Sequence, residues 1–271
     1  MTTKPRSALW VPLFDELADP LVAARLAAEA EEAGWDGFFV WDHVAWAAPV
    51  RRVADPWISL AAAATATESL RLGPMVTPVA RRRPVKLARE TASLDRLAGG
   101  RLTLGVGLGS DTYGEEFART GEQVDGRIRA EMLDETLDIL TAAWSGRPVR
   151  HYLVDDLAFQ PTPVQRPRVP VWVAGRAGRP KPLRRAARFD GHIPIGVRNP
   201  DQIAEIRETI HADPYDIAVP VPLGADPAAY FAAGATWCLT EFDPGELTLD
   251  QVRGVLLDGP AIPTLAKAVS R

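Results

Sequence analysis

The chain of 271 residues contains one cysteine, Cys238, and only four histidines. A single cysteine excludes an internal disulfide and any metal site built from clustered cysteines. The histidines are scattered and form no H-x-H or H-E-x-x-H pattern, so no metal site is expected. The chain also lacks a G-x-S-x-G motif, which argues against a hydrolase of the Ser-His-Asp type.

The sequence also lacks a long apolar run and an excess of positive charge. No stretch approaches the roughly 20 apolar residues that cross a membrane, and the N-terminus shows no apolar segment before a small-residue cleavage site. The net charge of -4 argues against a protein that binds nucleic acid mainly through electrostatics. We therefore expect a cytoplasmic protein that uses neither a membrane nor a nucleic acid as a partner.

What the sequence contains is a regular alternation of short β-type runs and helical segments. Two helical segments begin with Asp-Pro, at Asp19-Pro20 and Asp55-Pro56, which joins a capping side chain to the proline that suits a first helical turn. The eight expected strands cover residues 7–14, 37–41, 70–79, 101–109, 169–175, 192–197, 215–223 and 236–242.

Eight strands alternating with helices predict the α/β class and a closed parallel (β/α)8 TIM barrel, formed by a single domain of residues 1–271. An open doubly wound sheet is the alternative, and the absence of G-x-G-x-x-G after the first strand weakens its dinucleotide-binding form. Two insertions interrupt the alternation: a polar connection of residues 110–125 after the fourth strand, and a proline-rich, hairpin-like insertion of residues 147–168 before the fifth. We expect both to cover the barrel mouth and to influence substrate choice.

The stretch "GWDGFFVWDHV", residues 34–44, ends an apolar strand on Asp42 and His43. In a barrel of this kind, catalytic groups lie at the carboxyl ends of the strands and in the loops that follow. A histidine there can donate, accept or shuttle a proton near neutral pH. We therefore take His43 as the candidate catalytic residue and Asp42 as a residue that orients it or contacts a cofactor. A structural cap or loop hydrogen bond is the alternative.

The remaining strand ends, which include Glu241, carry few ionisable side chains, and several tryptophans lie near them. An apolar, aromatic mouth with few polar groups suits a small, planar organic ligand better than a sugar or a metal cluster. We assign Trp10 and Trp46, the latter just past the Asp-His pair, to the substrate pocket. Trp172 lies in mid-strand and is expected in the barrel core.

A second candidate feature is the stretch "AGRAGRPKPLRRAAR", residues 174–188, which joins the fifth strand to a helix. Its glycines expose backbone N–H groups, and the start of a helix favours an anion. We expect a phosphate to bind here, whereas the later arginines of the stretch are expected on a solvated helix face. The residues assigned to the phosphate are Gly175, Arg176, Ala177 and Gly178.

Three stretches together resemble the luciferase-like monooxygenase family of flavin- and deazaflavin-dependent oxidoreductases. They are "AEEAGWDGFFVWDHV", "RLGPMVTPVARRRPVKLARETASLDRLAGGRLTLGVGLG" and "RPRVPVWVAGRAG…LRRAARFDG". The resemblance runs from about residue 7 to residue 195, and it implies a (β/α) barrel with insertions. It further implies FMN or the deazaflavin F-420 as cofactor, bound in the mouth with its phosphate near the later strand ends.

The resemblance also assigns residues to the cofactor ring. Family members often carry a non-proline cis peptide bond at the end of the third strand, beneath the ring, and here that bond would be Met75–Val76. We expect both residues to support the ring together with Thr77. At the end of the fourth strand, close approach of backbone amides to the cofactor is expected at Gly107, Gly109 and Ser110.

Asp42, His43 and Trp46 resemble active-site residues of the deazaflavin-dependent sugar-phosphate dehydrogenases of this family. Those enzymes place an acid directly after the glycine-rich fourth strand, where this chain has Ser110. The difference argues against sugar-phosphate oxidation and leaves general redox chemistry open. Positive charge at residues 81–83 would suit the anionic tail of F-420, although a solvated loop explains these arginines equally well.

We therefore predict an oxidoreductase or monooxygenase that acts on a small organic substrate by hydride transfer or oxygen activation at FMN or F-420. The cofactor carries this chemistry, and the protein supplies orientation and electrostatics. A flavin reductase that supplies reduced cofactor is a candidate partner, and family members are usually homodimers. The alternatives are a phosphosugar isomerase or lyase on the same barrel, and a flavin-binding protein without catalysis.

Overall fold

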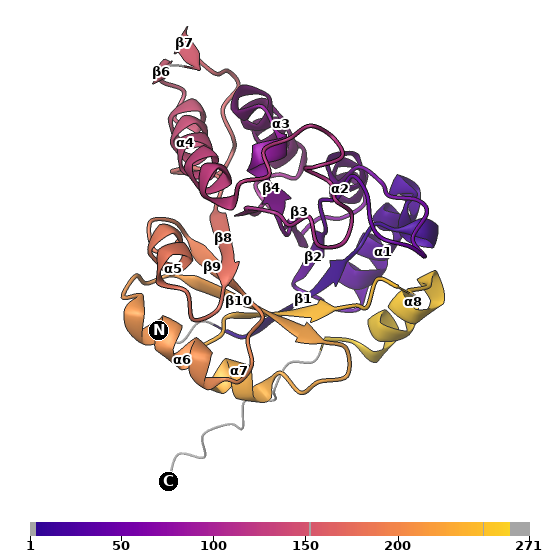
Figure 1. Cartoon of the computed structure of the whole chain (residues 1–271). Coiled ribbons are helices and arrows are strands. Elements are labelled where there is room, and N and C mark those ends of the chain that lie inside the picture. The colour runs from indigo at the N-terminus through magenta and orange to yellow at the C-terminus, as the bar shows by residue number, and fades with distance from the viewer. Residues whose placement is uncertain (1–3, 152, 246, 261–271) are drawn as a thin grey trace.

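The computed structural model describes residues 4–151, 153–245 and 247–260. Its main sheet is parallel and has the strand order β3-β2-β1-β11-β10-β9-β8-β5-β4. The two ends of this order adjoin, because β3 and β4 are halves of one predicted strand and Leu72 of β3 bridges to Leu102, just before β5. The sheet is thus a nearly closed barrel, which confirms the predicted class (Figure 1). Its strands are β1 (Arg6–Val11), β2 (Gly37–Val40), β3 (Arg71–Pro74), β4 (Thr77–Pro78), β5 (Leu104–Gly107), β8 (Val171–Arg176), β9 (Gly191–Ile195), β10 (Asp216–Pro222) and β11 (Trp237–Glu241).

Helices surround the barrel strands (Figure 1), and two of them begin at the predicted Asp-Pro signals. Pro20 and Pro56 begin α1 and α2, and the preceding Asp19 and Asp55 each accept a hydrogen bond from a backbone N–H of the first turn. No helix in the described ranges is long and apolar enough to span a membrane. The helices are α1 (Pro20–Glu32), α2 (Pro56–Thr65), α3 (Pro84–Leu97), α4 (Gly126–Trp144), α5 (Pro180–Ala186), α6 (Asp201–Thr209), α7 (Ala228–Ala232) and α8 (Leu249–Asp258), with short 3-10 turns η1 (Asp15–Leu17) and η2 (Val79–Arg81).

The alternation of side chains along each strand separates an inner from an outer core. On β11, Trp237 and Leu239 belong to the inner cluster, whereas Cys238 between them packs outward with α6 and β10. The inner cluster is aromatic, since Phe39 and Trp172 also belong to it. Trp172 therefore lies in the barrel core, as expected from its mid-strand position.

The third predicted strand is interrupted between β3 and β4 at Met75–Val76, and this peptide bond is cis. The family resemblance had indicated that bond. The indole N–H of Trp10 donates a hydrogen bond to the carbonyl of Met75. Two glycines of β5 leave room for the bulge: a Cβ on Gly105 would lie 2.5 Å from the Met75 sulfur, and one on Gly107 would lie 2.8 Å from Val76. Met75 and Val76 therefore pack directly against the glycines of the neighbouring strand β5.

The insertion of residues 147–168 contains an antiparallel hairpin, as its sequence suggested, and Figure 1 shows this hairpin beside α4 and apart from the barrel sheet. Beyond it, the carbonyl of Gln160 accepts a hydrogen bond of 2.6 Å from Arg89, and Val164 donates one of 2.7 Å to Asp95, both on α3. These contacts lie along an outer helix, and the cover of the mouth by this insertion stays a prediction. The hairpin strands are β6 (Val149–His151) and β7 (Val154–Leu157).

Neighbouring barrel strands approach so closely that one added methyl group should strongly lower the stability of the protein. A Cβ on Gly73 would lie 1.9 Å from the backbone oxygen of Thr103, so Gly73→Ala should destabilise the protein by about 3 kcal/mol or more. Gly254→Ala is the matched control, because Gly254 lies inside α8 with nothing within 4 Å. It should stabilise the protein by up to about 1 kcal/mol. Urea unfolding measures both, and equal midpoints would contradict the packing described here.

Candidate active site

Aromatic side chains line the carboxyl end of the barrel around the predicted Asp-His pair. Trp10 and Trp41 have ring centroids 5.3 Å apart. Trp46 lies 5.5 Å from Trp41 and 5.3 Å from Phe14, and its ring meets His43 edge-on at 4.6 Å. The two tryptophans assigned to a substrate pocket are therefore joined through Trp41. We call these four residues, Trp10, Phe14, Trp41 and Trp46, the aromatic wall.

His43 is partly exposed at this mouth, with 22% of its side chain accessible. Its Nδ1 lies 2.8 Å from Oε2 of Glu116, which belongs to the polar connection between β5 and α4. An ionised carboxylate only accepts hydrogen bonds, so Nδ1 carries the proton and donates it. The neutral imidazole then has its lone pair on Nε2. The arrangement gives His43 the form of a base.

Glu116 is a buried residue with a full set of partners. Its Oε1 accepts hydrogen bonds from the backbone N–H groups of Val44, at 2.5 Å, and Ala45, at 3.2 Å, and Arg81 lies 3.7 Å away. Burial opposes its ionisation, but the hydrogen bond and charge interaction with His43, the charge of Arg81 and the amide of Val44 outweigh burial and hold its pKa below the usual value. Glu116 is therefore ionised at neutral pH.

Asp42 points away from His43 and into a second ionic contact. Its Oδ2 accepts hydrogen bonds from Thr77, at 2.9 Å, and from both Nε and Nη2 of Arg82, at 3.1 and 2.7 Å. Arg81 donates to the Asp42 carbonyl at 2.7 Å. The Asp42 side chain is fully buried. Two carboxylates and two guanidinium groups thus form one buried network behind His43.

This network changes the roles expected at the strand end. The residue hydrogen-bonded to His43 is Glu116 and not Asp42, because the carboxylate of Asp42 is occupied by Arg81, Arg82 and Thr77. Asp42 fixes the arginines instead. No group of three or more His, Cys, Asp or Glu side chains that could hold a metal ion occurs in residues 4–151, 153–245 and 247–260.

The polar connection of residues 110–125 packs directly on the segment that carries His43. Tyr113 stacks on Trp46 with ring centroids 4.7 Å apart and planes inclined by 18°. The backbone at Gly114 comes so close to Ala45 that an added Cβ would lie 2.5 Å from its carbonyl oxygen. Together with Glu116, these contacts hold the connection at the rim of the mouth.

The residues expected to support a cofactor ring differ in their access to it. Met75 and Thr77 are buried, and Thr77 donates its hydroxyl proton to Asp42. Val76 alone is partly exposed, and it packs against the inner aromatic cluster. Of these three side chains, Val76 is therefore the one that could touch a ligand, whereas the other two hold the bulge from behind.

The glycines after the fourth strand accommodate protein atoms. A Cβ on Gly107 would meet Val76, and one on Gly109, whose φ is +71°, would lie 2.7 Å from Phe117. Their small size is thus already explained by packing inside the protein. Ser110 is exposed, and its hydroxyl lies 2.7 Å from that of Thr112. The contacts described for Gly107, Gly109 and Ser110 are with other parts of the protein, so their role in cofactor binding stays a prediction.

The loop after β8 forms one wall of a cavity of about 190 Å³ that also touches α5, α6 and His192. Of the predicted phosphate residues, Arg176, Ala177 and Gly178 line this cavity, whereas Gly175 packs against Pro182. The N–H of Ala177 already donates to Ile195. Further donors beside the cavity are the N–H of Gly178, the side-chain amide of Gln202 and exposed arginine side chains.

His192 adds no positive charge to this cavity at neutral pH. Burial lowers its pKa to about 4, although the hydrogen bond between its Nδ1 and the Val173 carbonyl acts in the opposite direction. An anion in the cavity would depend on Arg176, Arg179 and the Gly178 amide.

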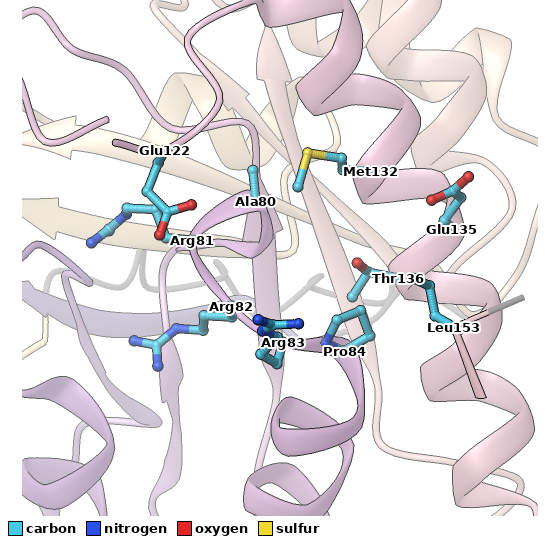
Figure 2. Close-up of a pocket in the computed structure, with 10 residues that line it drawn as sticks. All are labelled: Ala80, Arg81, Arg82, Arg83, Pro84, Glu122, Met132, Glu135, Thr136 and Leu153. Carbon is cyan, nitrogen blue, oxygen red and sulfur yellow. The ribbon is translucent and has the colours of Figure 1, made fainter. Parts of the chain in front are cut away.

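The arginine run at residues 81–83 is divided between two environments. Arg81 and Arg82 are held by the buried network, and Figure 2 shows their guanidinium groups turned away from Met132 and Thr136. Arg83 is exposed and lines a surface cavity of about 350 Å³ whose other charged residues include Glu122 and Glu135. A solvated loop therefore describes Arg83 alone.

The partners of the Asp-His pair could not be identified from sequence. Glu116 lies 73 residues from His43, in a polar connection with several other acids. Arg81 and Arg82 belong to a run of three arginines that resembles an ordinary solvated loop. The available signal was the position of this run directly after the third strand, at the same barrel end as Asp42.

We expect Glu116→Gln to destabilise the protein by about 2–3 kcal/mol at pH 7, because a buried charge-assisted contact is lost. The folded-state pKa of Glu116 lies below its unfolded value, so its stabilisation is present at neutral pH and is lost as pH falls through the folded pKa. The difference between wild type and variant should therefore shrink at pH 3. Urea unfolding at both pH values measures it, with exposed Glu115→Gln as control. A difference that does not change with pH would refute this interpretation of the pair.

Comparison with known proteins places this geometry in context. Residues 16–224 match the family model described as luciferase-like monooxygenase. An F-420-dependent glucose-6-phosphate dehydrogenase of Beutenbergia cavernae is 37% identical over 172 residues, which cover 60% of this chain and 49% of that protein. The oxygenase component of a flavin-dependent trigonelline monooxygenase of Acinetobacter baylyi is 26% identical over 60% of this chain and 44% of its own length.

The solved structures agree on the fold. An F-420-dependent secondary alcohol dehydrogenase, in complex with an F-420-acetone adduct, superposes with a TM-score of 0.70 and 22% identity over 92% of this chain and 84% of its own. This chain spans about half of the length of each of the two curated relatives. Because the family model covers most of the sequence, the chain belongs to the luciferase-like monooxygenase family.

Proposed function

We propose that this chain is a deazaflavin-dependent oxidoreductase that moves a hydride between F-420 and a small organic alcohol or its carbonyl product. The observation that carries the proposal is the His43–Glu116 pair, which places a base with an available Nε2 at the mouth of a barrel of this family. Oxidation of an alcohol needs such a group, since the hydroxyl proton must leave as the hydride is transferred.

The residues at the mouth fit a flavin-type ring. Val76 is partly exposed on a bulge that is buttressed by Met75, by the indole of Trp10 and by the glycines of β5. The cavity beside Arg176 and Gly178 would hold the phosphate. When bound, the cofactor supplies the hydride acceptor or donor. His43 would take or return the hydroxyl proton at Nε2, while Glu116 keeps the imidazole in place.

The choice of F-420 over FMN is supported by the relatives. The dehydrogenase of Beutenbergia cavernae, whose name specifies F-420, is more similar to this chain than the flavin-dependent oxygenase component. Arg81 and Arg82 are occupied by acids, so they give no support to a site for the F-420 tail. If the cofactor is FMN, we propose a monooxygenase that depends on a separate flavin reductase for reduced cofactor.

The first test mixes the purified chain with FMN and with F-420 and follows cofactor fluorescence. We expect F-420 to bind at least tenfold more tightly than FMN. Tighter binding of FMN would select the monooxygenase alternative. Binding of neither would leave a phosphosugar isomerase or lyase on the same barrel, and binding without reduction by any alcohol would leave a non-catalytic flavin-binding protein.

His43→Ala tests the base itself. Removal of a general base lowers turnover by about 10²–10⁴-fold, so we expect a loss in that range with F-420 affinity unchanged within about twofold. His211→Ala is the control, because His211 is exposed beyond α6. Unchanged turnover in His43→Ala with cofactor bound would remove this residue from the mechanism.

We also propose that the chain works as a cytoplasmic homodimer, and that α2 belongs to the dimer interface. α2 has the sequence PWISLAAAAT without a charged residue, although outer helices of a barrel usually carry a polar face. Its Ile58 is 61% exposed, and Leu21 on the neighbouring α1 is 63% exposed.

Light scattering tests the dimer, which should have twice the chain mass of 29.4 kDa. Ile58→Glu should convert the dimer into monomers, because it places a charge inside an apolar contact. Leu257→Glu is the matched control, since Leu257 lies on α8 and is 88% exposed. A monomeric wild type, or a dimer that both variants leave intact, would refute α2 as the interface.

A further inference from the structure

Glu241 is the last residue of β11, at the carboxyl end of the barrel. On this strand, Trp237 and Leu239 face the inner aromatic cluster, whereas Thr240 faces a cavity on the outside. Side chains alternate along a strand, so Glu241 has the same direction as Leu239 and points into the mouth. The strand that closes the barrel beside β1 therefore ends in an inward carboxylate.

The immediate surroundings of Glu241 offer it no partner. In register beside it stand Trp10 on β1 and Pro222 on β10. The indole N–H of Trp10 is committed to the Met75 carbonyl, and the ring nitrogen of a proline has no proton to donate. No hydrogen bond or ion pair of the Glu241 side chain occurs within the described residues.

Three other acids at this end of the barrel have partners, and Asp15 among them accepts hydrogen bonds from the backbone N–H groups of Arg51 and Arg52. Asp42 is held by Arg81 and Arg82, and Glu116 is held by His43 and two backbone amides. Burial raises the pKa of Glu241, with no neighbouring group that counters the effect. An unpaired carboxylate in a half-buried position costs stability, which points to a ligand that completes it.

The aromatic wall indicates what kind of ligand this is. Glu241 adjoins Trp10, and the wall continues through Trp41 to Trp46 beside His43. The faces of such rings attract cations, and a carboxylate beside them attracts the same charge. An organic ammonium group meets both conditions, whereas an anionic or fully apolar group meets at most one of them.

We propose that Glu241 is a specificity-determining residue, which together with the aromatic wall selects substrates that carry a positively charged nitrogen. The proposal rests on the oxidoreductase function above and names the substrate class for it. The substrate would place its cationic nitrogen beside Glu241 at the exposed edge of the aromatic wall, and its reacting carbon toward His43. The anionic part of the cofactor would lie at Arg176 on β8, which β10 and β9 separate from β11.

The test compares two molecules of nearly the same shape, choline and its uncharged analogue 3,3-dimethylbutan-1-ol, by titration calorimetry and by tryptophan fluorescence. The purified protein is used with and without F-420. Wild type should bind choline at least tenfold more tightly than the uncharged analogue. Glu241→Gln should reduce this preference to less than about twofold, with the affinity for the uncharged alcohol unchanged.

Glu32→Gln is the control, because it removes the same charge from an exposed position on α1. It should keep the preference for choline. Equal affinity of wild type for both alcohols would overturn the proposal, and so would a preference that survives in Glu241→Gln. Wild-type binding of F-420 is measured in parallel. If F-420 binds while choline has no advantage, the substrate class is wrong and the proposed function stands; if F-420 does not bind, the proposed function fails by itself.

Discussion

The candidate site depends on the buried ionic network that joins Arg82, Asp42, Arg81, Glu116 and His43. Taking five ionisable groups out of water is costly, and the cost is offset only when each charge has close partners of the opposite sign. The network meets this condition with two carboxylates for two guanidinium groups. His43 joins this set through the hydrogen bond of its Nδ1 to Glu116, which leaves Nε2 as the ring nitrogen without a partner in the network.

The network also joins parts of the chain that the barrel alone would leave separate. Asp42 and His43 follow β2, the arginines follow β4, and Glu116 lies beyond β5. Three consecutive βα connections are thereby fixed to one another at the carboxyl end of the barrel. The remaining half of the mouth, formed by β8 to β11, has no comparable network in the described residues. It carries Arg176 on one strand and Glu241 on another, the two residues that we propose contact the ligands.

The barrel could be predicted from the sequence because its strands and helices carry local sequence signals. Apolar runs marked the strands, and Asp-Pro pairs marked helix starts at residues that the structure confirms. The position of Met75–Val76 came from the family resemblance, since no local propensity indicates a cis bond before valine. His43 was found because the rule for barrel strand ends depends only on order along the chain.

The partners of these residues were not predictable for a physical reason. The contact between His43 and Glu116 spans 73 residues and depends on the path of a connection without regular structure. Charge patterns give no register for such a loop, whereas apolar periodicity gives one for a strand. For the same reason the glycines after the fourth strand were assigned to ligand contact, although Val76 and Phe117 of the protein itself fill the space beside two of them.

The stack of Tyr113 on Trp46 links the entry of a substrate to the positioning of His43. The connection that carries Tyr113 also carries Glu116, three residues later, so the ring stacked on Trp46 and the partner of His43 belong to one short piece of chain. If this piece moves aside to admit a substrate, His43 loses the carboxylate that fixes its proton on Nδ1. An open mouth then holds an unpositioned histidine, and the base is assembled only as the entrance shuts. If His43 is the base proposed above, entry of the substrate and positioning of the base depend on the same segment.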